Sequence, residues 1–220
     1  VDTVYNLTGI NSSYDDYNSN LYQLGGGLSI IFSSNRGSSG GQFDLVQGSY
    51  WFIFDQTNGD FNVASSLIND PFFASLISTA NTAGNDYGPL THFSTSDGYE
   101  YLLLSSQNAG GPLDLYYLRY QPRFNENLPA ISGPFPVNKF NTASNEGYIS
   151  FDSNEDSAYF SSDRNGNYDI FVHKKLLGKA LNLWMDSTYI SSTPVDSVNT
   201  IYDDKCPFIF RNVMVFTSNR

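Results

Sequence analysis

The chain has 220 residues, a net charge of −11 and one cysteine, Cys206. This length is enough for one domain with a sizeable core, or for a string of small repeats that share one. The excess of acidic residues, 22 against 11 Lys and Arg, repels phosphate backbones and argues against a nucleic-acid partner. A single cysteine excludes an internal disulfide and a cysteine-based zinc site. No apolar run approaches the ~18 to 20 residues of a membrane span.

Four six-residue segments, here called hexads, share one pattern in which Asn comes first and an acidic residue last. The hexads begin at Asn11, Asn81, Asn141 and Asn199 and end at Asp16, Asp86, Glu146 and Asp204. Their starts are 70, 60 and 58 residues apart. Self-similarity at such a spacing indicates a repeat architecture.

A second shared segment follows each hexad start after 18 to 24 residues and contains two hydroxyl residues in a row. The four copies read "IIFSSNR", "LLLSSQN", "AYFSSDR" and "MVFTSNR", with Arg at Arg36, Arg164 and Arg220 but not in the second repeat. A third segment occurs in three repeats and is headed by Asp44, Asp114 and Asp169. We expect each Arg to hydrogen-bond the Asp of the third segment or a turn carbonyl.

Alternation of apolar and polar residues predicts strands within each repeat. In the third repeat these are residues 147–152, 157–162 and 168–174, with a looser fourth strand within 180–192. The link 63–80 is the place for a short helix, which Asp70-Pro71 would start.

Each repeat is therefore a four-stranded antiparallel meander, which cannot bury both of its faces alone. Stacking such units around an axis gives a β-propeller. The predicted class is all-β, a propeller of four-stranded blades with four visible repeats at about 10–68, 81–130, 141–192 and 199–220, the last incomplete. Residues 1–220 form one domain, either whole or part of a longer propeller.

The hairpin pattern "FSSxR…G…YDIF", preceded by "NT…E", resembles the WD-like propeller repeat of TolB and related Gram-negative envelope proteins. The resemblance extends over about residues 10–220 and is clearest at 141–175 and 199–220. It implies a propeller fold and a role in binding other envelope proteins, and it implies no shared catalytic site.

The stretch "FSSDRNGNYDIF" places oxygen-bearing side chains at alternate positions, as a calcium loop does. They belong to Asp163, Asn165, Asn167 and Asp169. No EF-hand glycine or bidentate Glu follows at the required spacing. Asp163 and Asp169 also occupy repeated positions, so we favour a structural turn, with a calcium site as the alternative. We expect no cofactor.

Two functional hypotheses follow. The first is a non-enzymatic binding module that presents loops or a central funnel to a protein or peptide partner of the cell envelope. The alternative is a carbohydrate-active propeller, either a glycosidase or a glycan-binding lectin. Catalysis would require acids that break the repeat pattern and converge, and the acids outside the pattern, Glu100, Glu126 and Asp186, are scattered. The first hypothesis is therefore favoured.

Composition and repeat spacing lead to two further expectations. Few lysines among many Asn, Ser, Gly and Tyr residues are typical of exported proteins, so we expect a periplasmic or extracellular location. A lipid anchor on an N-terminal segment that is removed or lies outside this sequence is one way in which the chain could be held there. We also expect residues 2–7 to add as a strand to 207–219, because propellers avoid exposed sheet edges. Any missing strand would then follow Arg220.

Overall fold

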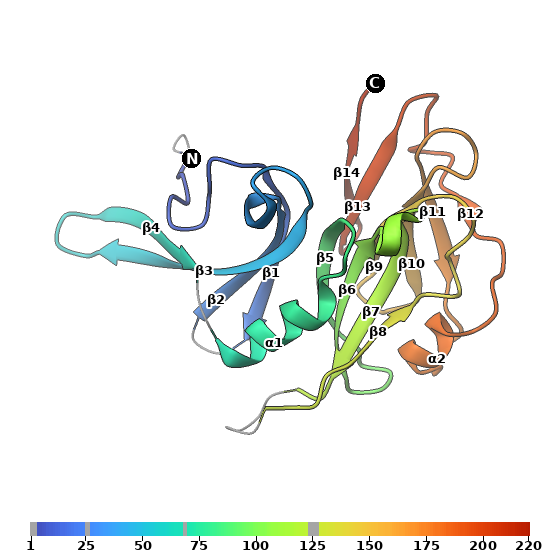
Figure 1. Cartoon of the computed structure of the whole chain (residues 1–220), viewed down its shortest axis with the longest axis horizontal. Coiled ribbons are helices and arrows are strands. Elements are labelled where there is room, and N and C mark those ends of the chain that lie inside the picture. The colour runs from blue at the N-terminus through green and yellow to red at the C-terminus, as the bar shows by residue number, and fades with distance from the viewer. Residues whose placement is uncertain (1–3, 25–26, 68–69, 123–127) are drawn as a thin grey trace.

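The computed structural model describes residues 4–24, 27–67, 70–122 and 128–220. It shows an all-β protein with a propeller-like arrangement of antiparallel sheets (Figure 1). Three sheets have four strands and the fourth has two. Each sheet corresponds to one sequence repeat, so the predicted fold class is confirmed. We number the sheets as blades 1 to 4 in chain order.

Blade 1 contains β1 (Asp16–Leu24), β2 (Gly27–Ser34), β3 (Asp44–Asp55) and β4 (Asp60–Leu67). Blade 2 contains β5 (Asp86–Phe93), β6 (Glu100–Ser106), β7 (Asp114–Tyr120) and β8 (Ser132–Pro136). Blade 3 contains β9 (Glu146–Phe151), β10 (Ser157–Ser162), β11 (Asp169–Lys174) and β12 (Thr193–Pro194). Blade 4 contains β13 (Asp204–Phe210) and β14 (Val213–Ser218).

Two α-helices connect these strands. α1 (Pro71–Ala80) lies in the link where a helix was expected, and the Asp70 side chain caps it by accepting the N–H groups of Phe72 and Phe73. α2 (Leu181–Met185) falls where a fourth strand was predicted, and that prediction was wrong. Leu181, Trp184 and Met185 recur at helical spacing and pack into the core between blades 2 and 3. The fourth strand, β12, comes later in the chain.

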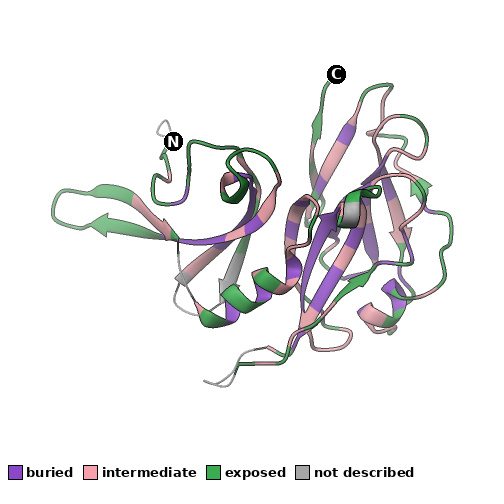
Figure 2. Ribbon diagram, viewed as in Figure 1, coloured by how far each residue is buried: buried purple, intermediate pink, exposed green. Residues whose placement is uncertain are grey.

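The core lies between the faces of successive blades. Figure 2 shows buried residues concentrated on β6, β7, β9 and β10. Phe32, Leu104, Phe160 and Phe216 occupy equivalent positions in β2, β6, β10 and β14, as predicted. These are the second strands of their blades rather than the strands nearest the axis. Phe32, Leu104 and Phe160 are buried, whereas Phe216 is half-buried.

The predicted pairing of residues 2–7 with 207–219 was wrong for the part that the structure describes. Residues 4–7 form no strand, and β14 pairs with β13 alone. The N-terminal segment lies instead against blade 1, where the Tyr5 hydroxyl donates to the Phe61 carbonyl (2.7 Å). Ile10 is buried against Ile30 and Phe32. Covering this apolar face is more favourable than leaving it in water. Residues 2 and 3 lie outside the described part.

The distal part of the β3–β4 hairpin extends away from the blades (Figure 1). It exposes apolar side chains on both of its faces, namely Trp51, Phe52, Ile53, Phe54 and Phe61. Among the described residues no helix is both long and apolar enough to span a bilayer.

Candidate functional site

The first residue of the hexad joins each blade to the one before it. The Asn81 amide accepts the Leu45 N–H (2.7 Å) and donates to the Leu45 carbonyl (3.1 Å), so it pairs with β3 as a strand would. Asn141 does the same to Leu115, and Asn199 to Ile170. The Asn11 amide donates to the Asn6 side chain instead.

The strand nearest the axis in every blade contains a bulge two residues after the hexad acid. The bulge residues are Asn18, Gly88, Tyr148 and Cys206, with φ between 53° and 59°. Positive φ is uncommon outside glycine. A Cβ on Gly88 would lie 2.6 Å from the Tyr148 ring, so no larger residue fits there without a shift.

The bulge turns a backbone N–H toward the preceding blade, where the first hydroxyl of the paired Ser/Thr segment accepts it. Gly88 donates to Ser33 (3.2 Å), Tyr148 to Ser105 (2.9 Å) and Cys206 to Ser161 (3.0 Å). Sequence analysis found the hydroxyl residues but not their partners, because the four bulge residues share no side-chain chemistry.

The repeated Arg binds the hexad acid, not the Asp of the third strand as expected. The partner of Arg36 is Asp16 (2.6 Å), that of Arg164 is Glu146 (3.1 Å) and that of Arg220 is Asp204 (3.2 Å). Each guanidinium also donates to the carbonyl that precedes the hexad Asn. Each Arg therefore does bind a backbone carbonyl, as one of the two expected partners. The acid that it binds is the last residue of the hexad and not the Asp of the third strand.

Burial and hydrogen bonding act in opposite directions on the pKa of three hexad acids. Burial raises the pKa of Asp16, but hydrogen bonds from Arg36, Ser34 and Ser12 outweigh it and hold the pKa at about 2. Burial likewise opposes the hydroxyls and Arg220 at Asp204, where the net pKa is lowered. Asp86 has no Arg among its hydrogen-bond partners, and burial raises its pKa.

The third-strand acids stand beside the hexad acids of the following blade. Asp44 accepts a hydrogen bond from Gln42 (3.0 Å), and Asn165 hydrogen-bonds Asp169. In blade 2, Asp114 Oδ1 is buried and, within the described residues, has no hydrogen-bond partner. Burial, followed by the negative charge of Glu146, raises the pKa of Asp114 to about 6.

The four residues of the proposed calcium loop hold the chain rather than converge on one point. Asp163 accepts the backbone and side-chain N–H groups of Asn145 (2.8 and 2.6 Å). Asn167 donates to the carbonyls of Thr200 and Tyr202. Asn165 binds Asp169, as described above. Among the residues that the structure describes, no three His, Cys, Asp or Glu side chains gather as a metal-binding group.

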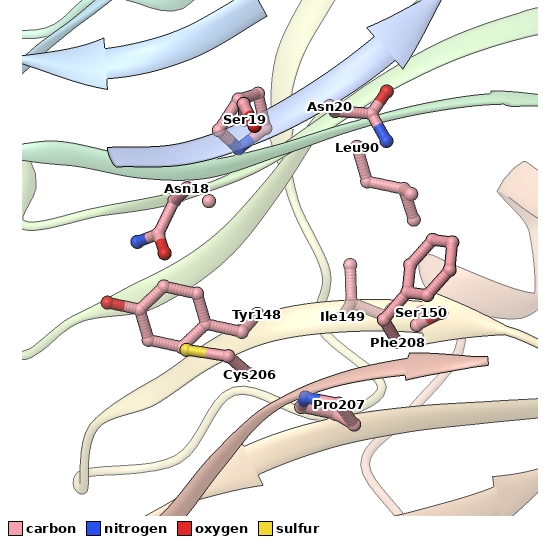
Figure 3. Close-up of a pocket in the computed structure, with 12 residues that line it drawn as sticks. Asn18, Ser19, Asn20, Leu90, Tyr148, Ile149, Ser150, Cys206, Pro207 and Phe208 are labelled. Atoms are coloured by element: carbon pink, nitrogen blue, oxygen red, sulfur yellow. The ribbon is translucent and has the colours of Figure 1, made fainter. Parts of the chain in front are cut away.

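The four axial strands line a small open pocket of about 110 Å³. It is lined by residues 18–20 of β1, 88–90 of β5, 148–150 of β9 and 206–208 of β13, none of them charged. In Figure 3 the Tyr148 side chain points toward Asn18, with the Cys206 sulfur beside the ring. Asn18 hydrogen-bonds the Tyr148 hydroxyl, and burial raises the pKa of that phenol.

A larger groove of about 460 Å³ adjoins this pocket and shares Leu90, Ser150 and Phe208 with it. Its remaining lining residues are His92, Phe151, Asp152, Ser153, Ile209, Phe210 and Arg211. The groove thus lies between β5, the β9–β10 turn and the β13–β14 hairpin. Its volume is within the range of small-molecule sites.

A buried polar cluster supports one wall of the groove. Glu155 Oε1 accepts the Ser94 hydroxyl (2.8 Å) and lies 3.9 Å from both His92 Nε2 and Lys175 Nζ. Burial raises the pKa of Glu155, but the contacts with His92, Ser94 and Lys175 outweigh it and lower the pKa. Glu155 Oε2 and His92 Nε2 are buried without hydrogen-bond partners among the described residues.

Glu100 and Asp186, two of the acids outside the repeat pattern, do not line the groove. Glu100 is buried at the start of β6, and Asp186 accepts the Tyr117 hydroxyl (2.7 Å). Glu126 lies outside the described residues. The groove could not be predicted from the sequence, because its residues come from blades 2, 3 and 4 and become neighbours only when these blades are arranged around one axis.

Comparison with known proteins gives structural neighbours alone. No family model and no curated protein matches the sequence. One similar solved structure is a thermostable family-43 glycoside hydrolase, at 14% identity and a TM-score of 0.45 over 88% of this chain and 61% of that chain. Another is a glycosyl hydrolase from Bacteroides ovatus, at 12% identity and a TM-score of 0.45 over 94% of this chain and 60% of that one.

This chain therefore spans about three fifths of the length of those two proteins. Both are glycoside hydrolases and neither is a TolB-type protein, so the prediction of a non-enzymatic envelope binding module is contradicted and is not retained. A TM-score of 0.45 is too low to carry over their activity or site residues. The resemblance to TolB-type repeats stays a prediction.

Proposed function

We propose that this chain is a carbohydrate-binding propeller and that the 460 Å³ groove is its glycan site. The observation that supports the proposal is the lining of the groove. Phe208 and Phe210 are exposed there, close to hydroxyl, carboxylate, imidazole and guanidinium groups. A pyranose ring has an apolar C–H face and a rim of hydroxyls, so it needs an aromatic ring and hydrogen-bonding groups side by side.

Binding is better supported than hydrolysis. Most glycosidases place two carboxylates on either side of the scissile bond. In the described part of the chain, Asp152 is the one carboxylate that lines the groove. Its Oδ1 already accepts the N–H groups of Asp156 (2.7 Å) and Ser157 (3.3 Å). Glu155 is held by Ser94 and does not line the groove.

The test is a screen of neutral and acidic polysaccharides, followed by calorimetry on the best ligand. We expect saturable binding that Phe210→Ala weakens about fivefold, because stacking on an exposed ring contributes roughly 1 kcal/mol. Phe54→Ala is the matched control, since Phe54 is 60% exposed on the remote hairpin and Phe210 is 61% exposed. Equal losses in both variants, or no binding to any glycan, would contradict the proposal.

Hydrolysis is tested in the same samples by the release of reducing ends. We expect none above background. Turnover that Asp152→Asn abolishes would instead make the chain a glycosidase and Asp152 a catalytic group.

We also propose that the repeats are of the TolB type and that the chain acts outside the cytoplasm, in the periplasm or extracellularly. The repeated "FSSxR…YDIF" segments and the low lysine content support both points. Fractionation of the native organism with an antibody against this chain would test the location, and recovery in the cytoplasm would refute it. Release of the native protein by detergent but not by salt would indicate a lipid anchor.

A further inference from the structure

Another pocket, of about 420 Å³, lies beside α2 and shares no lining residue with the glycan groove. Its walls come from β11, from α2 and the loops on either side of it, and from Lys139 in the link between blades 2 and 3. In Figure 1, α2 lies far from the C-terminus. The volume of the pocket is within the range of small-molecule sites.

The charge of this pocket is opposite to that of the chain. The sequence has 22 acidic residues and only five lysines, and three of these lysines, Lys139, Lys174 and Lys179, line the pocket. Within the part of the chain that the structure describes, no carboxylate lines it. The three lysines also form no ion pair with any described residue. Because like charges repel one another, the arrangement favours an anion bound among them.

Lys139 is the most deeply buried of the three lysines. It is 4% exposed, and its Nζ donates to the carbonyl of Thr188, another lining residue (3.3 Å). Its backbone N–H donates to the Met185 carbonyl of α2 (2.9 Å), which fixes the position of the chain there. Burial, followed by the positive charge of Lys179, lowers the pKa of Lys139. A buried ammonium without a carboxylate partner is costly unless another anion neutralises it.

Neighbouring contacts hold Lys179 and His173 in place. The Lys179 carbonyl accepts a hydrogen bond from the ammonium of Lys175 (2.9 Å), which is itself buried. On β11, His173 Nδ1 lies 3.3 Å from the Ser192 hydroxyl. Burial, followed by the positive charge of Lys139, lowers the pKa of His173, so this imidazole is neutral at pH 7. The positive charge of the pocket at that pH therefore comes from its lysines.

We propose that this pocket binds a small molecule that carries a phosphate monoester and an apolar group. A lysine ammonium is a compact point charge that suits phosphate, whereas carboxylate recognition favours the planar fork of arginine. A phosphate monoester carries a charge of about −1.5 to −2 at pH 7, which balances most of the charge of the lysines. Leu176 and Ile190 line the pocket and are exposed, so they supply the contact for the apolar group.

The probe is phenyl phosphate, titrated into the intact chain by isothermal titration calorimetry. We expect saturable binding that weakens as salt is added, because the attraction is electrostatic. Phenyl sulfate has the same ring but a single negative charge, and we expect it to bind at least about fivefold more weakly. Inorganic phosphate should bind more weakly than phenyl phosphate, since it makes no apolar contact.

The variant that tests the site is Lys179→Gln, which should weaken the binding of phenyl phosphate about fivefold, because one of the three cations is lost. Lys179 is only partly buried, so its replacement threatens folding less than that of Lys139. Lys205→Gln is the matched control. It changes the net charge of the chain equally, and Lys205 lies in blade 4 beside Asp203.

Three results would overturn the proposal. The first is the absence of saturable phenyl phosphate binding to a chain that circular dichroism shows to be folded. The second is equal binding of phenyl sulfate, which would refute a phosphate ligand, or of inorganic phosphate, which would refute the apolar contact. The third is an equal loss in Lys179→Gln and Lys205→Gln, which would indicate a general effect of net charge. None of these results bears on the glycan groove, so this proposal and the proposed function fail independently.

Discussion

Blades 2 and 3 bury the same acidic position in two different ways. In blade 3 the Glu146 carboxylate accepts the N–H and hydroxyl of Thr142 and the hydroxyl of Ser162, and it pairs with Arg164. In blade 2, Asp86 accepts the same two groups of Thr82 but has no Arg at the equivalent position, which Asn108 occupies. Both acids are 0% exposed.

The comparison separates two interactions of the hexad acid that occur together in the other blades, namely its hydrogen bonds within the hexad and its ion pair with Arg. The hydrogen bonds from the hexad shape the turn, and they are present in both blades. The Arg neutralises the acid, and where it is missing, burial raises the pKa of Asp86. The hexad acid is therefore required by the turn geometry, whereas the cation is an addition that stabilises its ionised form.

Removing the acid should affect the two blades unequally. Glu146→Ala should lower the free energy of unfolding by about 3 to 5 kcal/mol, because Arg164 is left as a largely buried charge without its partner. Asp86→Ala leaves no cation behind and should cost only about 1 to 2 kcal/mol from lost hydrogen bonds. Urea denaturation measures both. Equal losses would show that the Arg pair adds nothing to blade 3.

The Asn at the start of the hexad gives the next largest effect. Asn141→Ala leaves the N–H and carbonyl of Leu115 without their side-chain partners, which should cost about 2 kcal/mol. Asn11→Ala is the control, because Asn11 binds Asn6 on the surface and joins no two blades. We expect its cost to be within about 0.5 kcal/mol. A loss at Asn11 as large as that at Asn141 would refute the role of this residue between blades.

Asp114 in blade 2 should make stability fall as the pH rises. Its folded pKa of about 6 lies above the ordinary aspartate value of 3.8. The folded state therefore favours the protonated form, and this contribution, present below about pH 4, is lost as the pH rises through 6. Asp114→Asn should be about 1 kcal/mol more stable than the parent at pH 8, after allowance for solvent screening, and no more stable at pH 4.

The measurement is the difference in unfolding free energy between parent and variant at the two pH values, which cancels the titration of every other group. A difference that does not change with pH would show that Asp114 is not the titrating residue.

The smallest effect should come from giving blade 2 the missing cation. Asn108→Arg should lower the pKa of Asp86 and stabilise the fold at pH 7 by no more than about 1 kcal/mol, the usual value of a partly exposed pair. NMR titration of the Asp86 carboxyl carbon reports the pKa directly. An unchanged pKa would mean that the turn of blade 2, in which Asn108 hydrogen-bonds Tyr116, cannot take the Arg conformation of blade 3.

The sequence by itself determined the repeat, its strands and the start of α1, because these depend on local alternation, turn residues and a helix cap. Strands such as β10 fell at their predicted limits, residues 157–162. α2 was missed because a five-residue helix is stabilised by the core it packs against, through Trp184 and Met185, rather than by its own propensity.

Only the tertiary structure decided which groups meet. Spacing favoured the wrong acid for Arg164, because Asp169 is five residues away and Glu146 is 18 residues away, yet the fold brings Glu146 to the guanidinium. The shared bulge was hidden because its Asn, Gly, Tyr and Cys residues have no side-chain chemistry in common, and the hydroxyl that accepts the bulge N–H of Gly88, Tyr148 and Cys206 lies in the preceding blade. The groove between β5, β9 and β13 joins residues about 60 positions apart in the chain. Their proximity depends on how the blades are arranged around the axis, and no local pattern encodes that arrangement.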